Sequence, residues 1–208
     1  MRGEHLATRL LSLKTKRQVH FYSNRDLLAH INETYAGPHR GGQLFDWGEL
    51  YCELFKPGPM LQERIDATKA GIGGDYYAAV FRFQNLLGDF PEYHYKPLND
   101  KEKEEQLIQK CLDAVRELMA KHGGMPLLVT ADSMTFLKRV SQIDGVHIIP
   151  GTLTHIDGNK HHTPGNQNEA YLKSFLDFYM LSEAQKVYRI GTPKMWHSAF
   201  PVFAAKIH

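Results

Sequence analysis

Strand-like and helix-like segments alternate along the chain after residue 70, and this alternation restricts the fold more than any other feature of the sequence. Apolar segments with strand character occur at 76–83, 126–130, 146–149 and 187–190. A helical segment follows each of them. Such alternation is typical of βαβ units, in which parallel strands form one sheet between layers of helices. The sequence therefore predicts a Rossmann-like α/β domain with a mostly parallel sheet and helices on both faces.

The longest helix is predicted over 103–122, where apolar residues recur at spacings of three and four. Gly123 and Gly124 end it. Cys111 lies on its apolar face and is expected to be a buried free thiol. Shorter helices are predicted at 133–141, 169–185 and 198–206.

The first 70 residues carry a different pattern. A short strand is predicted at 18–22, a helix at 25–31 and a glycine-rich loop at 36–48. A helical stretch over 49–70 is interrupted by Lys56-Pro57-Gly58-Pro59. We expect a boundary near residue 70, between an N-terminal segment at 1–70 and a ligand-binding domain at 71–208.

Composition excludes several classes of protein. The net charge of +2, with no run of basic residues among aromatic ones, argues against a nucleic-acid partner. No apolar stretch approaches the roughly 18 residues of a membrane span. The two isolated cysteines, Cys52 and Cys111, fit a reducing compartment, so a cytoplasmic location is expected.

The ends of the predicted strands carry the polar residues of interest, because ligands of such sheets bind beyond the carboxyl ends of the strands. Arg82 lies near the end of the first of these strands, followed by Asn85 and Asp89. An arginine in this position needs an anion or a carboxylate beside it. It is either a phosphate ligand, with Asn85 nearby, or a structural ion pair, for example with Asp89.

Two further strand ends carry similar alternatives. Asp132 and Ser133 directly follow the second strand, where Asp132 could bind a ribose or a base or could cap the next helix. Ser198 and Phe200 follow the last strand after Gly191-Thr192-Pro193. Ser198 would either bind an anion at the start of the final helix or simply cap that helix.

Other familiar sites lack support. The chain has no Gly-x-Gly-x-x-Gly motif, no P-loop and no Gly-x-Ser-x-Gly elbow. His155, Asp157, His161 and His162 could together ligate zinc or iron, but they occupy a Gly/Pro/Asn-rich loop and no second cluster supports them. We therefore expect no metal site, and keep a metal-dependent hydrolase as a remote alternative.

Taken together, the strand ends resemble the donor-binding half of α1,2/α1,6/protein O-fucosyltransferases, which have a GT-B-like architecture. In that family one strand ends in His-x-Arg, and Val80-Phe81-Arg82 matches the arginine but not the histidine. A later strand ends in Thr/Ala-Asp-Asp/Ser, which Thr130-Ala131-Asp132-Ser133 matches. Ser198-Ala199-Phe200 resembles the phosphate-binding serine segment. The likeness covers roughly 71–208.

The resemblance implies a glycosyltransferase that moves fucose from GDP-fucose to a glycan or other hydroxyl acceptor with inversion and without an obligatory cofactor. Arg82 and Ser198 would stabilise the diphosphate leaving group, and Asn85, Asp132, Ser133 and Phe200 would contact the donor. Asp89, seven residues after Arg82, is the expected general base. Residues 1–70 would form a partial or minimal acceptor part.

The alternative from another class is a noncatalytic nucleotide- or glycan-binding module that keeps the fold. Val80 in the place of the family's histidine and the short N-terminal segment favour this second interpretation.

Overall fold

The computed structural model describes residues 12, 14, 26–89, 95–151, 153 and 167–207 of the 208-residue chain. These residues divide into two compact units, Met1–Lys56 with Ile207, and Pro57–Lys206 with His208. Each unit is described by itself. The strand predicted at 18–22 and the histidine-rich loop at 155–162 lie outside the described residues.

The first unit is helical. It contains α2 (Leu28–Ile31), the π-helical turn η1 (Asn32–Ala36), α3 (Gly37–His39) and α4 (Trp47–Leu54). The amide of Asn32 joins the helical turns to the following segment, since it accepts from the Phe45 N–H at 2.7 Å and donates to the Phe45 carbonyl at 2.7 Å. The glycine-rich loop predicted at 36–48 is therefore shorter than expected, because helical backbone continues to His39.

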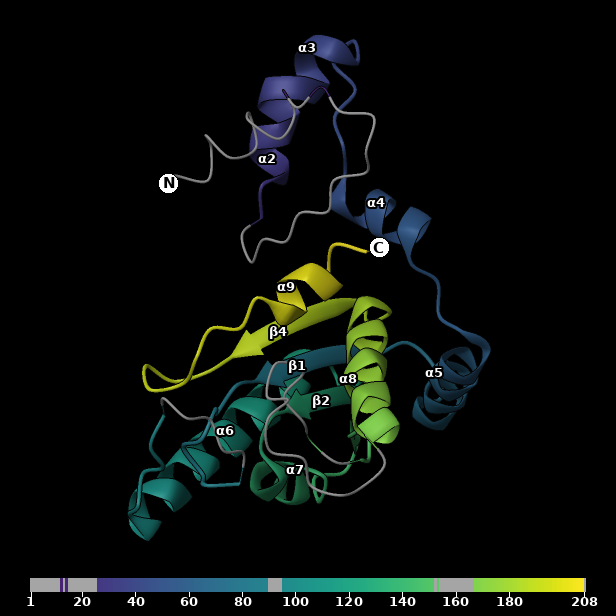
Figure 1. The fold of residues 1–208 in the computed structure, drawn as a ribbon. Helices are drawn as coiled ribbons and strands as arrows, with labels where there is room; N and C mark the ends of the chain where they lie inside the picture. Colours follow the sequence, from purple (N-terminus) through teal and green to yellow (C-terminus); the bar gives the residue numbers. More distant parts are fainter. Residues whose placement is uncertain are drawn as a thin grey trace. The chain divides into compact units, whose positions relative to one another are not determined.

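The second unit is an α/β domain, as predicted (Figure 1). Its strands are β1 (Tyr77–Phe81), β2 (Leu127–Ala131), β3 (Val146–His147) and β4 (Lys186–Ile190). Their helices are α5 (Pro59–Ile72), α6 (Lys101–Lys121), α7 (Met134–Val140), α8 (Gln167–Ser182) and α9 (Phe200–Ala204). The predicted break near Pro57 is confirmed, since α4 ends at Leu54 and α5 begins at Pro59.

The four strands are all parallel and lie in the order β3-β2-β1-β4. Phe81 at the end of β1 pairs in register with Ala131 on one side and with Ile190 on the other. In chain order the strands pass from β1 through β2 to β3, and then cross to the opposite side of β1. This reversal creates a topological switch point between the carboxyl ends of β1 and β4.

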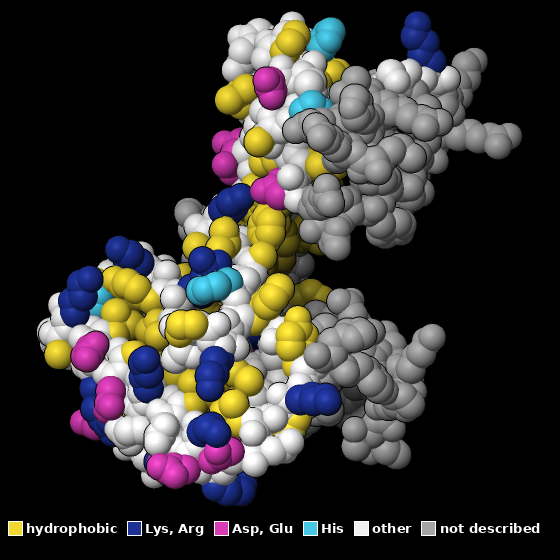
Figure 2. Space-filling view, turned by 90° about the vertical axis from the view of Figure 1, so that its left-hand side faces the viewer, with side chains coloured by type: hydrophobic (Ala, Val, Ile, Leu, Met, Phe, Trp, Pro, Cys, Tyr) yellow, Lys and Arg dark blue, Asp and Glu magenta, His cyan; other side chains and the backbone are white. Residues whose placement is uncertain are grey.

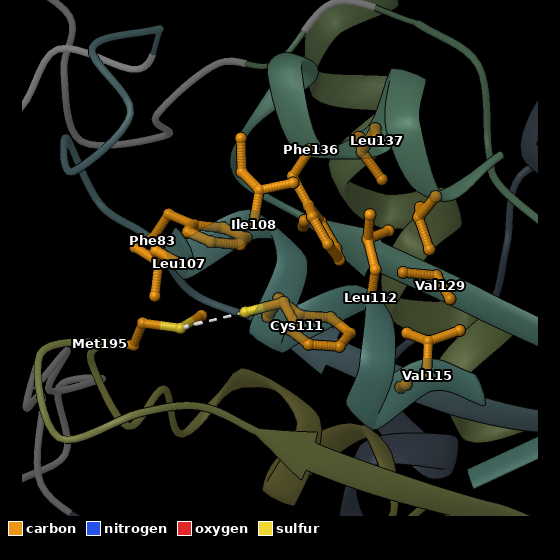
Figure 3. Packing of buried hydrophobic residues seen from close by; sticks show 14 of the residues in the cluster. Phe83, Leu107, Ile108, Cys111, Leu112, Val115, Val129, Phe136, Leu137 and Met195 are labelled. Atoms are coloured by element: carbon orange, nitrogen blue, oxygen red, sulfur yellow. Dashed lines mark hydrogen bonds between the residues drawn. The ribbon is translucent and has the colours of Figure 1, made fainter. Parts of the chain in front are cut away.

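Helices cover both faces of the sheet, and the alternation of side chains along β1 explains how. Ala79 and Phe81 point toward α6 and α7, and join a buried cluster that includes Cys111, Val115 and Phe136 (Figure 3). Cys111 is a free cysteine and is 2% exposed, so the prediction of a buried free thiol is confirmed, and burial raises the pKa of this thiol to about 12.

The opposite face is covered by α5, α8 and α9. Ala78 and Val80 join a second buried cluster that contains Ile65, Met180 and Ala204. The side chains of the central strands β1 and β2 are almost entirely buried, whereas those of β4 are only partly so. Among the described helices, none is long and apolar enough to cross a membrane.

Candidate functional site

The candidate site lies at the carboxyl edge of the sheet, where the loops after β1, β2 and β4 meet. Because the strands are parallel, all three loops leave the sheet on the same side. Two of them are joined directly, since the Trp196 N–H donates to the Arg82 carbonyl at 3.1 Å. The switch point between β1 and β4 is therefore bordered by residues from 82–89 and 191–196.

Arg82 and Asp132 form an ion pair at this edge. The guanidinium Nη1 lies 2.9 Å from the Asp132 carboxylate, and 22% of the Arg82 side chain is exposed against 8% of that of Asp132. The structure thus gives Arg82 a carboxylate partner, but this partner is Asp132 and not Asp89. The planar fork of a guanidinium held in this way has a fixed direction.

Asp132 also accepts two backbone hydrogen bonds from the loop after β1. Its Oδ1 accepts from the Phe83 N–H at 2.6 Å, and its Oδ2 accepts from the Gln84 N–H at 2.7 Å. Burial raises the pKa of the Asp132 carboxyl to about 6, against the opposing effects of Arg82 and the backbone donors. Asp132 therefore ties two strand ends together and is not the cap of α7.

The backbone at Gln84 makes this double contact possible. Gln84 has a φ of 55°, in the left-handed region that few residues other than glycine adopt. The turn directs two successive N–H groups at one carboxylate. Sequence reasoning missed it, because glutamine carries no signal for a left-handed conformation.

Ser133 and Asp89 form a second inward-facing group. The Ser133 hydroxyl caps α7 by accepting from the Phe136 N–H at 3.1 Å, and it donates to Asp89 Oδ2 at 3.0 Å. The same Asp89 oxygen accepts from the Thr135 N–H. Asp89 Oδ1 is buried and has no hydrogen-bond partner among the described residues. Ser133 is fully buried, and its hydrogen bond to Asp89 joins the start of α7 to the loop after β1.

The segment after β4 places its residues in opposite directions. Met195 is buried, and its sulfur lies 3.8 Å from that of Cys111 (Figure 3). Trp196, the next residue, has 55% of its surface exposed. The Thr192 hydroxyl oxygen is buried and has no hydrogen-bond partner among the described residues.

Ser198 and Phe200 lie further along the same segment. The Ser198 hydroxyl accepts from the Phe200 N–H at 3.2 Å, two residues before the short helix α9 begins. The Phe200 ring packs against Phe178 with centroids 5.2 Å apart, within the second buried cluster. The last helix is thus shorter than the predicted 198–206. The expected contacts of Ser198 and Phe200 with a donor stay predictions.

Asn85 holds a neighbouring aromatic residue. Its side-chain nitrogen donates to the Tyr95 carbonyl at 2.9 Å, and the Tyr95 ring lies 6.4 Å from that of Trp196 at 57°. Sequence reasoning gave no role to either ring. The usable signal was the presence of large aromatic residues in polar loops next to strand ends.

The described part of the chain does not include the histidine cluster that suggested a metal site. Among the described residues, no group of three or more His, Cys, Asp and Glu side chains could hold a metal ion. The histidines that suggested one, His155, His161 and His162, lie outside those residues, as does Asp157.

No family model matches the sequence, and no curated protein matches it either. Two solved structures are similar in fold. One is NodZ alpha-1,6-fucosyltransferase soaked with GDP-fucose, with a TM-score of 0.43 and 18% identity over 73% of this chain. The other is NodZ alpha-1,6-fucosyltransferase co-crystallized with GDP, with a TM-score of 0.43 and 19% identity over 72% of this chain. The chain spans only 43% and 42% of their lengths. Values this low describe a partial similarity of fold and say nothing about activity.

Proposed function

We propose that the carboxyl edge of the sheet binds the diphosphate of a nucleotide sugar, and that the chain carries the donor site of a glycosyltransferase. The observation that carries the proposal is the Arg82 guanidinium, which Asp132 orients at the carboxyl ends of β1 and β2, while the Arg82 backbone borders the switch point between β1 and β4. Parallel sheets bind ligands at such points, and a guanidinium matches the geometry of phosphate oxygens.

The identity of the donor rests on the sequence resemblance. Val80-Phe81-Arg82, Thr130-Ala131-Asp132-Ser133 and Ser198-Ala199-Phe200 favour GDP-fucose, with a glycan or other hydroxyl as acceptor. The division into an acceptor part at 1–70 and a donor domain at 71–208 belongs to the same proposal.

Arg82 would act on the leaving group. When the bond between sugar and phosphate breaks, negative charge grows on the diphosphate and the sugar becomes cationic. A guanidinium with a fixed direction stabilises that charge without first having to reorient. In this proposal Asp132 is a positioning residue, because its carboxylate is already bonded to Arg82 and to the N–H groups of Phe83 and Gln84.

A specific observation favours the second candidate, a binding module without turnover. Asp89, the expected general base, accepts hydrogen bonds from Ser133 and Thr135 through Oδ2, and its Oδ1 is buried. A carboxylate held in this way is poorly placed to take a proton from an acceptor hydroxyl. In addition, valine occupies position 80, where the family that the sequence resembles has a histidine.

Calorimetry with GDP, UDP and ADP tests the shared part of both candidates. We expect GDP to bind most tightly, and Arg82→Ala to weaken it by about 30-fold or more through loss of a charge-assisted contact. Arg82→Lys keeps the positive charge but loses the planar fork of donors, so its affinity for GDP should lie between those of the unaltered chain and of Arg82→Ala. Arg116→Ala is the matched control, because Arg116 is an exposed arginine whose ion-pair partner among the described residues is Asp113 on its own helix.

Two results would contradict the proposal: no nucleotide binds to the unaltered chain, or Arg82→Ala binds GDP as well as Arg116→Ala does. Release of fucose from GDP-fucose, with and without a glycan acceptor, then separates the enzyme from the binding module.

A further inference from the structure

Two exposed aromatic rings border the switch point, and neither contributes to the buried core. The exposed fraction is 55% for Trp196 and 37% for Tyr95, and their ring centroids lie 6.4 Å apart. Among the described Phe, Tyr and Trp residues of this domain, only Tyr95, Phe175 and Trp196 are exposed, and Tyr95 and Trp196 form a pair beside the candidate site.

The backbone of Trp196 is anchored at its own N–H and at the residue before it. Its N–H donates to the Arg82 carbonyl at 3.1 Å. The preceding Met195 is buried against Cys111, and the Met195 N–H donates to the Thr192 carbonyl at 2.9 Å. The indole is therefore carried by an anchored segment, whose backbone is hydrogen-bonded to that of Arg82, the residue proposed to bind phosphate.

Tyr95 is anchored to the same loop as Arg82. Its carbonyl accepts from the Asn85 side chain at 2.9 Å, and three residues later the Leu98 N–H donates to the Leu86 carbonyl at 3.0 Å. The two rings thus come from separate loops, after β1 and after β4, and are tilted by 57° with respect to each other. Such a pair offers a planar ligand the face of one ring and a side wall from the other.

The charges around the rings select the kind of ligand. Lys96 follows Tyr95, and Lys194 comes two residues before Trp196. Both lysines are exposed, and within the described ranges neither forms an ion pair. Figure 2 looks at the side of Figure 1 toward which β4 points, and on that face Lys and Arg side chains lie among hydrophobic ones, with Asp and Glu side chains also present. An anionic molecule with a planar ring fits this combination better than a neutral sugar does.

We propose that Trp196 and Tyr95 form the subsite for the base of the bound nucleotide, with Trp196 as the stacking surface. The inference rests on the proposed function, since it assumes that Arg82 binds the phosphates of the same molecule. It also replaces the nucleoside contact expected of Asp132, whose carboxylate oxygens are bonded to Arg82 and to two backbone N–H groups.

Binding of GDP and of inorganic pyrophosphate, measured side by side, tests the inference. Pyrophosphate has the phosphates but no base. We expect Trp196→Ala to weaken GDP binding about tenfold, or about 1.4 kcal/mol, and to leave pyrophosphate binding unchanged. Trp196→Phe retains an aromatic face and should restore most of the loss, and Tyr95→Ala should have a smaller effect than Trp196→Ala.

Phe175→Ala is the matched control, because Phe175 is an aromatic residue of α8 with 49% of its surface exposed. A second readout uses fluorescence. The chain has two tryptophans, so Trp47→Phe leaves Trp196 as the only one, and GDP but not pyrophosphate should quench it.

The outcomes separate the two proposals. If GDP and pyrophosphate bind equally well, or if Trp196→Ala weakens both to the same extent, the base subsite is wrong while the phosphate site at Arg82 stands. An effect of Phe175→Ala as large as that of Trp196→Ala also overturns the subsite. If neither compound binds to the unaltered chain, the proposed function fails and the subsite fails with it.

Discussion

The carboxyl ends of β2 and β4 lie at the same edge of the sheet, yet they use their side chains in opposite ways. After β2, Asp132 and Ser133 are both buried. Asp132 accepts from the backbone of the loop after β1, whereas Ser133 caps α7 and donates to the Asp89 side chain. After β4, Met195 is buried, and the next residue, Trp196, is exposed. The β2 end therefore holds the edge together, whereas the β4 end leaves an aromatic side chain exposed.

This difference shows that a polar residue at a strand end is not necessarily a ligand contact. A buried carboxylate needs hydrogen bonds and an opposite charge nearby. For Asp132, the N–H groups of Phe83 and Gln84 donate the hydrogen bonds, and Arg82 supplies the positive charge. Asp132 would therefore affect ligand binding only through Arg82, the residue that it orients, whose side chain is 22% exposed.

The largest effect is expected for Asp132→Ala. The change leaves two backbone N–H groups without an acceptor and Arg82 without its carboxylate, so we expect the free energy of unfolding to fall by about 3–4 kcal/mol. Urea unfolding followed by circular dichroism measures it. Asp113→Ala serves as the control, since the pair of Asp113 with Arg116 is exposed and should contribute less than about 0.5 kcal/mol. Equal losses in both variants would contradict a structural role for the β2 end.

Met195→Ala tests the anchor of the β4 end. Removing a buried side chain that packs against Cys111 should lower the free energy of unfolding by about 2–3 kcal/mol, and should also weaken GDP binding because Trp196 loses its support. Met60→Ala is matched in chemistry, but Met60 is 59% exposed and its loss should be nearly neutral. A destabilised variant that binds GDP normally would show that the loop does not depend on this anchor.

The β2 end should also make the stability of the domain depend on pH. Burial raises the pKa of Asp132 to about 6, above its ordinary 3.8, so the folded state binds the proton more tightly than the unfolded state does. This contribution to stability is fully present below pH 3.8 and is lost as the pH rises through about 6. The stability difference between the unaltered chain and Asp132→Asn should therefore narrow between pH 4 and pH 7. If it widens instead, the Arg82 charge outweighs burial and the pKa of Asp132 lies below 3.8.

Most elements of the fold could be predicted from local patterns. The apolar spacing over 103–122 identifies α6, because a helix that is buried on one face has apolar residues at every third or fourth position. The continuous apolar segment at 76–83 identifies β1, because a strand that is buried on both faces is apolar throughout. Boundaries were less accurate, as for α9, where five residues are helical in place of the expected nine.

The site could be predicted only in part, because its contacts join distant residues. Arg82 and Asp132 directly follow β1 and β2, but nothing in the sequence pairs Arg82 with Asp132, and the expected roles of both residues and of Ser198 in ligand binding stay predictions. The left-handed turn at Gln84 and the approach of Tyr95 to Trp196 depend on how β1, β2 and β4 are ordered in the sheet. Local patterns carry no information about that order.

The position of β4 next to β1 also has a consequence for folding. Paired residues of these two strands are about 110 positions apart in the chain, so their ladder forms only after a long loop has closed. Both loops that border the switch point come together in that late step. During synthesis the candidate site can form only after β4 has left the ribosome. A nucleotide that contacts both loops should slow the detachment of β4 from β1 in the folded domain.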